Sequence, residues 1–438
     1  MIISDMRQND PMTNAMITEQ DSAYARAVLV ALCCDGDDAH DVEVSFAELE
    51  RLLETAGGTV VAKMIQNRPS PDPRTCIGAG KTEELKSLCD ANDVSLVVFD
   101  RELTPSQIRN LEASLGDDAR VIDRSMLILD IFALHANSNE GKMQVELAQL
   151  KYTAPRLTGQ GEALSRLGGG IGTRGPGETK LETDRRHLQR RIKTLEQQID
   201  EMEENRAVQR KQRKRAGIFS VAIAGYTNAG KSTLLNALTG AGILAQDKLF
   251  ATLDPTTRKY TLPHGTEILL TDTVGFIRNL PHHLIRAFHS TLQEVTYADL
   301  IVVLIDASDP EWRGQLTITD TLIAQLGAGE KPVLYVMNKC DISPFADIPA
   351  RYDAHDVICI SAAQGTGLQE LAEKLEEFAD GQKKTLTFRF PYDQQGNVEK
   401  LHRDAVIISE EYQEDGVYVT AKCDARLCGQ LASFCVDD

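Results

Sequence analysis

Residues 225–232 read Gly-Tyr-Thr-Asn-Ala-Gly-Lys-Ser, between an apolar run at 219–224 and a helix-like stretch at 233–239. A glycine-rich turn between a strand and a helix points successive backbone N–H groups at one anionic group. A lysine at its end reaches terminal phosphates, and the serine that follows is a ligand for Mg²⁺. The segment therefore predicts a nucleotide-phosphate loop made of Gly225, Tyr226, Thr227, Asn228, Ala229, Gly230, Lys231, Ser232 and Thr233.

A second motif, after the apolar run at 333–336, predicts the base. Its four residues are Asn338, Lys339, Cys340 and Asp341. An aspartate at its end accepts the two adjacent donors of guanine, N1–H and the N2 amino group. Adenine would leave that carboxylate without a partner, and such a mismatch discriminates by orders of magnitude. Residues that follow the run at 357–360 are expected to present a backbone N–H to guanine O6, namely Ser361, Ala362 and Ala363. GTP and GDP are the expected nucleotides.

Two further segments predict the metal shell and the switches. The run at 268–271 leads into Asp272, Thr273, Val274 and Gly275. Asp272 is expected to hold Mg²⁺ through water, and Gly275 to meet the γ-phosphate. The other segment is Phe250, Ala251, Thr252, Leu253 and Asp254. Its Thr252 is the candidate switch threonine that completes a Mg²⁺ shell with Ser232 and Asp272, and Lys231, Thr252 and Gly275 are the candidate catalytic residues. Because the four elements stand in order, they indicate a GTP-binding domain.

Phe276 stands where many GTPases place a glutamine that orients the attacking water. A phenyl ring makes no such hydrogen bond, so slow intrinsic hydrolysis of GTP is expected. Either a partner remodels the switch, or another group positions the water. Alternatively Phe276 packs in the core, and a polar switch residue takes the glutamine's place, the candidates being His282, His283 and Arg286.

Residues 24–138 alternate apolar runs with amphipathic stretches, which indicates a small α/β domain with a mostly parallel sheet. The apolar runs are 27–32, 59–64, 95–99 and 120–122, and the amphipathic stretches are 46–56, 82–91 and 104–115. Gly78, Ala79, Gly80 and Lys81 superficially resemble a phosphate loop. They lack the preceding glycine, so an ordinary strand-to-helix turn is favoured over an ATP site.

Residues 141–155 and 178–215 read as a helical pair. Apolar residues at heptad-like spacing in the second segment are Leu181, Leu188, Ile192, Leu195, Ile199 and Met202, and those facing them from the first are Met143, Leu147 and Leu150. This spacing predicts a coiled-coil hairpin. Between the helices lies a glycine-rich loop, 168–178, which is either a functional tip or a flexible link.

Charge is unevenly distributed. Residues 141–216 hold 17 Lys and Arg against 10 Asp and Glu, a net of +7, so the rest of a chain at −18 overall carries −25. A basic limb on an acidic body can dock on RNA phosphates. The arginines proposed for that contact are Arg174 in the loop and Arg185, Arg186, Arg190 and Arg191 on the helix. RNA contact is favoured over a solvated helix face.

The domain boundaries follow from these segments. We expect a disordered stretch at 1–23, the α/β domain at 24–138, the helical linker at 139–216, a GTPase domain with a mostly parallel sheet at 217–381 and a small α+β domain at 382–438. In the last, strands at 386–390 and 416–421 bracket 398–408, which reads as a helix and its approach. The chain has no run of about eighteen apolar residues, so no membrane span is predicted. Nine cysteines without a Cys-x-x-Cys pair fit reduced thiols. A cytoplasmic monomer is expected, with peripheral membrane association left open.

The glycine-rich segment Arg174-Gly175-Pro176-Gly177-Glu178-Thr179, with the motifs around Thr252 and Asp272, resembles the HflX family of GTPases. The resemblance implies binding to the large ribosomal subunit and its RNA, and stimulation of GTP hydrolysis by the ribosome. It also implies splitting of stalled or idle ribosomes, particularly under stress, and ATP binding by the N-terminal region. A factor for ribosomal-subunit assembly and a regulatory switch that acts on a protein effector are the alternatives.

Overall fold

The computed structural model describes residues 26–116, 119–157, 176–215, 217–240, 242, 249–250, 253–281, 284, 289–342, 351–352 and 355–436. The chain forms two compact units. The first unit comprises residues 1–200, 246–254 and 274–291, and the second comprises 201–245, 255–273 and 292–438. The predicted multidomain α/β class is confirmed. None of the described helices is long and apolar enough to span a membrane.

A four-stranded, wholly parallel sheet organises the first unit, in the order β2-β1-β3-β4. Its strands are β1 (Arg26–Cys34), β2 (Thr59–Arg68), β3 (Leu96–Phe99) and β4 (Arg120–Asp123). The connecting helices are α2 (Ala39–Thr55), α3 (Ala79–Asn92) and α4 (Pro105–Leu115). Pro105 occupies the first turn of α4, where its missing N–H costs nothing, and Thr104 caps that helix. Gly78 precedes α3, and the Lys81 ammonium bonds both oxygens of Glu84 at 2.9 Å.

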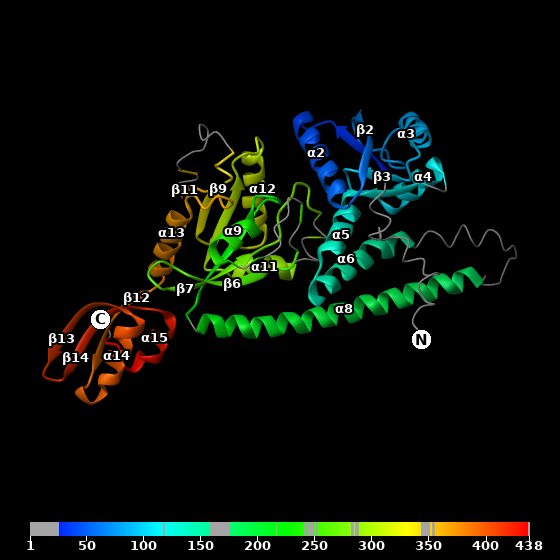
Figure 1. Cartoon of the computed structure of the whole chain (residues 1–438). Coiled ribbons are helices and arrows are strands. Elements are labelled where there is room, and N and C mark those ends of the chain that lie inside the picture. The colour runs from blue at the N-terminus through cyan, green and yellow to red at the C-terminus, as the bar shows by residue number, and fades with distance from the viewer. Residues whose placement is uncertain are drawn as a thin grey trace. The chain divides into compact units, whose positions relative to one another are not determined.

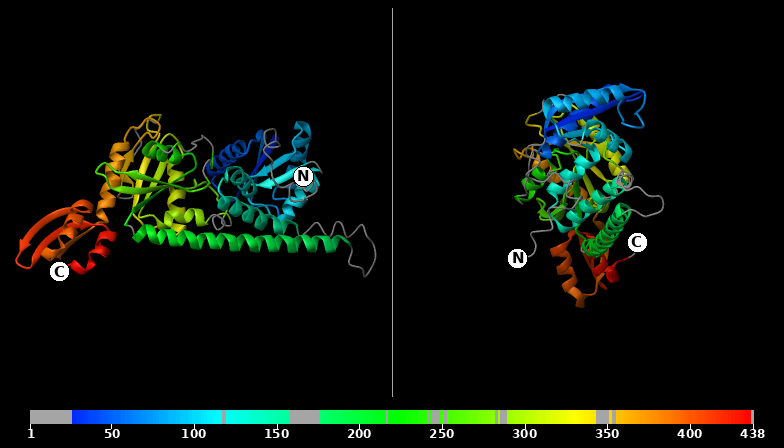
Figure 2. Two further views of the ribbon diagram at one scale, coloured as in Figure 1. Left: turned by 60° about the horizontal axis from the view of Figure 1, so that its bottom comes forward. Right: turned by 90° about the vertical axis from the view of Figure 1, so that its right-hand side faces the viewer.

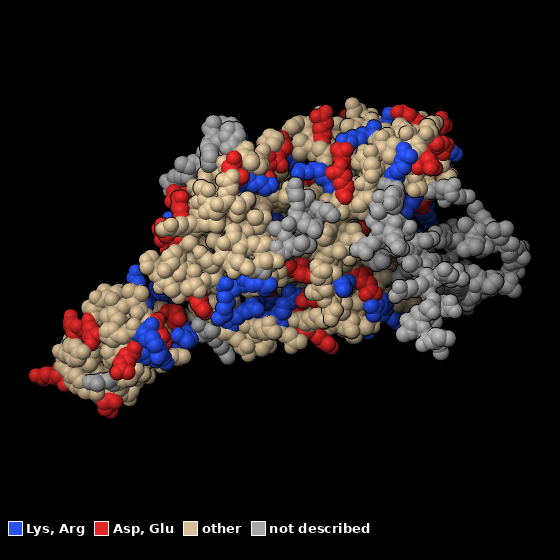
Figure 3. Space-filling view, viewed as in Figure 1, with Lys and Arg blue, Asp and Glu red and all other residues tan. Residues whose placement is uncertain are grey.

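Three helices follow, namely α5 (Arg124–His135), α6 (Asn139–Leu157) and α8 (Pro176–Arg215). Helices α2 and α5 pack together, as α3 and α4 do (Figure 1). Residues 124–132 of helix α5 are all buried. The helix therefore lacks the alternation of apolar and polar residues at helical spacing that identifies a surface helix in a sequence. Helix α8 is one unbroken helix of 40 residues (Figure 2). Lys and Arg side chains gather along it, with Asp and Glu among them (Figure 3).

The predicted seam between α6 and α8 is present. Its buried residues are Leu147, Leu150, Leu188 and Leu195, with Met143, Ile192 and Ile199 packed against them. The side chain of Leu181 lies outside the described residues, as does loop 168–175 with Arg174. Across the seam, Arg191 of α8 donates to both carboxylate oxygens of Glu146, at 2.6 and 2.7 Å.

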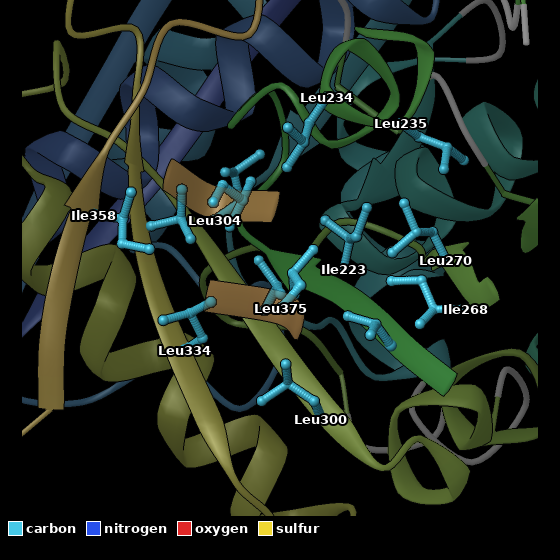
Figure 4. Packing of buried hydrophobic residues seen from close by; sticks show 14 of the residues in the cluster. Ile223, Leu234, Leu235, Ile268, Leu270, Leu300, Leu304, Leu334, Ile358 and Leu375 are labelled. Carbon is cyan, nitrogen blue, oxygen red and sulfur yellow. The ribbon is translucent and has the colours of Figure 1, made fainter. Parts of the chain in front are cut away.

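The second unit contains a seven-stranded sheet in the order β10-β11-β9-β8-β5-β7-β6. Its strands are β5 (Phe219–Gly225), β6 (Thr256–Thr261), β7 (Glu267–Asp272), β8 (Leu300–Asp306), β9 (Val333–Asn338), β10 (Arg351–Tyr352) and β11 (His355–Cys359). Only the outermost pairs, β6–β7 and β10–β11, are antiparallel. The helices here are α9 (Lys231–Thr239), α12 (Trp312–Gln325) and α13 (Leu368–Gly381). Helix α11 (His289–Tyr297) also belongs to this unit from residue 292 onward. Leucines and isoleucines from strands and helices fill the core (Figure 4).

The C-terminal part of this unit is an antiparallel sheet in the order β12-β14-β13. It comprises β12 (Lys384–Phe390), β13 (Val406–Gln413) and β14 (Gly416–Cys423), with α14 (Gln395–Asp404), α15 (Ala425–Gln430) and short 3-10 turns at η3 (Tyr392–Gln394) and η4 (Ala432–Phe434). The interpretation of 398–408 as a helix and its approach is wrong at its end, because α14 stops at Asp404. The β-branched run from Val406 instead begins a strand.

Candidate nucleotide-binding site

The predicted phosphate loop lies between β5, which ends at Gly225, and α9, which begins at Lys231. Gly225 has a φ of +146°, and a Cβ there would lie 2.2 Å from the carbonyl oxygen of Leu304. Gly230 has a φ of +94°, and a Cβ there would lie 2.3 Å from the side-chain nitrogen of Asn338. Both positions therefore favour glycine, because both have a positive φ, and because the Leu304 backbone lies close to Gly225 and the Asn338 side chain close to Gly230.

The Lys231 side chain is folded into this loop. Its ammonium donates to the carbonyl oxygens of Tyr226 at 2.7 Å and Gly225 at 3.2 Å, and the residue is 7% exposed. Burial lowers the pKa of Lys231 to about 8, and the neighbouring Asp272 charge opposes that shift only in part. A bound phosphate would supply the counter-charge that the buried ammonium requires.

The affinity for GDP should fall as the pH rises through the lowered pKa of Lys231. Phosphate favours the charged ammonium, so above about pH 8 binding must take up a proton, and the dissociation constant should rise by up to about tenfold per pH unit. Calorimetry in two buffers of different ionisation enthalpy counts that proton. We expect uptake near zero at about pH 7 and of most of a proton at about pH 8.5. Equal uptake at the two pH values would contradict the assignment.

The same pKa shift affects stability without nucleotide. Between about pH 8 and the ordinary lysine pKa near 10.5, the unfolded chain binds the proton more tightly than the folded one. The free energy of unfolding should therefore rise with pH across that window.

Ser232 and Asp272, which are predicted to bind Mg²⁺, lie side by side. The Ser232 hydroxyl donates to Oδ2 of Asp272 at 2.6 Å. Asp272 is fully buried, burial raises its pKa, and its Oδ1 has no hydrogen-bond partner among the described residues. A hydroxyl beside a buried carboxylate oxygen that lacks a partner suits a hard cation such as Mg²⁺. The residues therefore fit the ion.

Asn338 joins the phosphate loop to the second base-reading loop. Its side-chain N–H donates to the carbonyl oxygen of Ala229 at 2.8 Å, and its carbonyl oxygen accepts from the Ala362 backbone N–H at 3.0 Å. Asn338 is 2% exposed, so both bonds are protected from water. The motif identified Asn338 as part of the site without revealing that it fixes two loops at once.

The residues predicted to read the base lie on the loops after β9 and β11. Cys340 is buried, and its backbone N–H donates to the carbonyl oxygen of Ile360 at 3.1 Å. The Lys339 ammonium donates to Asp306 at 2.7 Å. Asp341 is exposed, with the Gln364 amide 3.4 Å from its carboxylate, and Gln364 also donates its backbone N–H to the Ser361 hydroxyl at 3.1 Å. Ala363 is exposed. Sequence reasoning missed Asp306 and Gln364, for which no motif gives a signal.

Most described residues of the two predicted switch segments belong to the first unit, whereas Asp272 and Thr273 belong to the second. Val274, Gly275 and Phe276 are buried, and the phenyl ring of Phe276 is only 1% exposed, as packing in the core requires. Phe250 and Leu253 are also buried, whereas Asp254 is half-buried and accepts hydrogen bonds from the start of α6. The candidates that lie outside the described residues are Ala251, Thr252, His282, His283 and Arg286.

Three family models match consecutive parts of the chain. Residues 43–133 match the family described as GTP-binding GTPase N-terminal, and residues 135–213 match the GTP-binding GTPase Middle Region. Residues 220–339, which hold the phosphate loop and end at Lys339, match the family described as 50S ribosome-binding GTPase.

Curated relatives extend along nearly the whole chain. The GTPase HflX of Lacrimispora saccharolytica is 48% identical over 407 residues, which are 93% of this chain and 95% of that protein. The GTPase HflX of Escherichia coli is 41% identical over 399 residues, 90% and 92% of the two chains. A GTP-binding protein of Sulfolobus solfataricus, crystallised with GDP, is 27% identical and covers 81% of this chain and 99% of its own, with a TM-score of 0.42. The identities and coverage of the curated relatives show that this GTP-binding and GTP-hydrolysing chain belongs to the HflX family of GTPases.

Proposed function

We propose that this GTPase acts in the cytoplasm on the large ribosomal subunit and splits stalled or idle ribosomes, particularly under stress. The observation that carries the proposal is the match of residues 220–339 to a family described as 50S ribosome-binding GTPase. The basic helix α8 supports it, because a lysine- and arginine-rich face is the electrostatic requirement for binding RNA phosphates.

Each part of the site has a separate task in hydrolysis. Lys231 would bind the terminal phosphates, Asp341 the guanine edge, and the Ala362 backbone region the guanine oxygen. Ser232, Asp272 and Thr252 would hold Mg²⁺, which neutralises charge that develops on the phosphates. Gly275 would meet the γ-phosphate. Phe276 is buried and cannot orient the attacking water. We therefore propose that ribosome binding rearranges the switch so that the water is positioned for attack on the γ-phosphate.

Density-gradient profiles of purified intact ribosomes test the proposal. Adding the full chain with GTP should deplete the intact peak in favour of free subunits, whereas adding it with GDP should not. In parallel, the ribosome should raise the GTP turnover of the chain at least about 100-fold, because partner-completed GTPase sites gain this much or more. Equal turnover with and without ribosomes would reject stimulation. Binding confined to immature particles, with intact ribosomes untouched, would favour the assembly role.

The basic residues of α8 are not equivalent. Arg185, Arg190, Arg191 and Lys193 are all exposed, but Arg191 also makes two hydrogen bonds to Glu146 across the helical seam. Lys151 of α6 likewise pairs with Glu196 of α8 at 2.7 Å. A cation that is already paired contributes less to counterion release when RNA binds. We therefore propose that Arg185, Arg190 and Lys193, rather than Arg191, supply most of the phosphate contacts within the described part of α8.

Replacing both Arg185 and Arg190 by alanine should weaken binding to the large subunit and flatten its salt dependence. Each lost phosphate contact should lower the slope of log K against log salt by about 1. The matched control is Arg191→Ala, which removes a paired cation from the same helix and should change the slope by less. Co-sedimentation over a salt series measures both. An unchanged slope in the double variant would place the RNA contacts elsewhere.

A further inference from the structure

Within the first unit, the carboxylate of Asp254 binds the start of helix α6. Its Oδ2 accepts the backbone N–H groups of Asn137 at 2.9 Å and Ser138 at 2.8 Å, and its Oδ1 accepts the Ser138 hydroxyl. Ser138 is itself the cap of the helix, because its hydroxyl accepts the Gly141 N–H at 2.9 Å and its carbonyl accepts the Lys142 N–H at 3.0 Å. A carboxylate beside the first turn of a helix is stabilised by the exposed N–H groups and the helix dipole.

Glycine at residue 141 leaves room for this carboxylate beside the first turn of α6, and a side chain there would force the carboxylate to move. A Cβ at Gly141 would lie 2.4 Å from Oδ1 of Asp254 and 3.1 Å from the Ser138 hydroxyl oxygen. Glycine disfavours a helix by roughly 1 kcal/mol relative to alanine. The helix therefore carries a locally unfavourable residue at the place where the Asp254 carboxylate binds.

The switch segment 250–254 has a second attachment, which is apolar and lies before the predicted switch threonine, Thr252, in the sequence. The ring of Phe250 packs edge-on against Phe132 of α5, with centroids 4.7 Å apart and planes at 82°. Phe250 is 3% exposed and has a φ of +56°, a conformation that costs energy in a phenylalanine and that the packing must offset. Leu253 is 2% exposed. The described part of this switch segment is therefore bound to both α5 and α6.

The sequence assigned Asp254 to the nucleotide, but its contacts point to another task. Both carboxylate oxygens accept hydrogen bonds from Asn137 and Ser138, the two residues immediately before α6. Helix α6 also packs through Leu147 and Leu150 against α8, the basic helix. A displacement of the helical pair would therefore reach the switch segment through the carboxylate of Asp254.

We propose that Asp254 is a positioning residue for GTP hydrolysis, which couples the helical linker to the switch segment through the first turn of α6. When the linker is displaced by its partner, the switch segment follows, and the hydrolytic site is ordered or released accordingly. The part of this inference that concerns the ribosome rests on the proposed function; the coupling between linker and nucleotide state does not.

The coupling can be tested without ribosomes by hydrogen exchange on the full chain. In the wild type, replacing GDP by a non-hydrolysable GTP analogue should change exchange both in peptides that cover 249–254 and in those that cover 137–145. In Gly141→Ala the switch peptide should still respond, while the response of the α6 peptide should drop severalfold. Alanine favours the helix, so loss of the fold does not account for this result. An undiminished response at α6 would overturn the inference.

Ribosome stimulation supplies the second measurement. Gly141→Ala and Asp254→Ala should each reduce ribosome-stimulated kcat at least tenfold. Both variants should still co-sediment with ribosomes as the wild type does. Gly141→Ala should also keep the wild-type affinity for GDP. Asp254→Asn should fall between these and the wild type, because an amide oxygen still accepts the two backbone N–H groups. The double variant Gly141→Ala, Asp254→Ala should be no worse than either single variant, since both break one contact. Additive losses would overturn the proposal. A wild type that ribosomes do not stimulate would instead reject the proposed function and leave the exchange result standing.

Discussion

Asp341→Asn should lower the affinity for GTP by about 100-fold or more, and it should raise the relative affinity for xanthosine triphosphate. The aspartate carboxylate accepts two N–H groups of guanine, whereas an asparagine amide turns a donor toward one of them and leaves it without a partner. Xanthine carries an oxygen at C2, which that amide can satisfy. Equilibrium binding of GTP and of xanthosine triphosphate to the wild type and to the variant measures how far the preference shifts from guanine to xanthine.

The structure makes this substitution a clean one. Asp341 is exposed, and its described contact is with the Gln364 amide at 3.4 Å, so the variant should fold as the wild type does. Gln364→Ala is the matched control, since it removes that contact and keeps the carboxylate, and its nucleotide preference should stay with guanine. An Asp341→Asn protein that still prefers GTP over xanthosine triphosphate would show that another residue reads the base.

The arrangement of the phosphate loop was predictable because a short pattern fixes it. Gly225 and Gly230 have positive φ angles, and a Cβ would lie 2.2 Å from the Leu304 carbonyl oxygen at the first and 2.3 Å from the Asn338 side-chain nitrogen at the second. That requirement appears in the sequence as two glycines at fixed spacing. Parallel sheets in both units follow equally directly from alternating strand and helix signals. The seam between α6 and α8 follows from heptad-like spacing.

Other features were hidden because they depend on residues far apart in the chain. Asp254 lies in a switch motif, yet its partners are 116 and 117 residues away. Nothing local to the motif indicates which group its carboxylate binds. The sequence pattern predicts a helix for the first part of β13, because Val406 closely follows a helical stretch. For α5, complete burial of residues 124–132 removed the periodic signal on which helix prediction depends.

Arg124 is a second hidden feature, and it leads to the largest expected effect on stability. The guanidinium is 2% exposed, pairs with Glu48 and lies 2.6 Å from Asp100. It also donates to the carbonyl oxygen of Arg278 at 3.1 Å, which attaches residues 274–279, the second switch segment, to the same cluster. Two further bonds hold that segment, from Arg278 to Asp41 at 2.8 Å and from Asn279 to Ser45 at 3.1 Å.

Arg124→Leu should cost the first unit roughly 3–5 kcal/mol, because it leaves two nearly buried carboxylates without their counter-charge. Hydrogen exchange on the full chain measures the loss locally. Peptides covering β1 and β3 should exchange faster by a factor of roughly 10² to several times 10³, since each factor of ten corresponds to about 1.4 kcal/mol. Peptides from β8, in the second unit, should exchange at the wild-type rate.

Two further variants test whether the cost of Arg124→Leu comes from leaving buried carboxylates without a counter-charge or only from losing an arginine. Arg101→Ala removes an ion pair with Asp37 whose members are 39% and 35% exposed, so it should cost less than about 1 kcal/mol. Adding Glu48→Gln and Asp100→Asn to Arg124→Leu neutralises both stranded carboxylates and should restore much of the protection. If the triple variant is no more stable than Arg124→Leu alone, the cluster stabilises the unit by packing and by its bond to the switch carbonyl, and charge compensation is not the reason that the arginine is buried there.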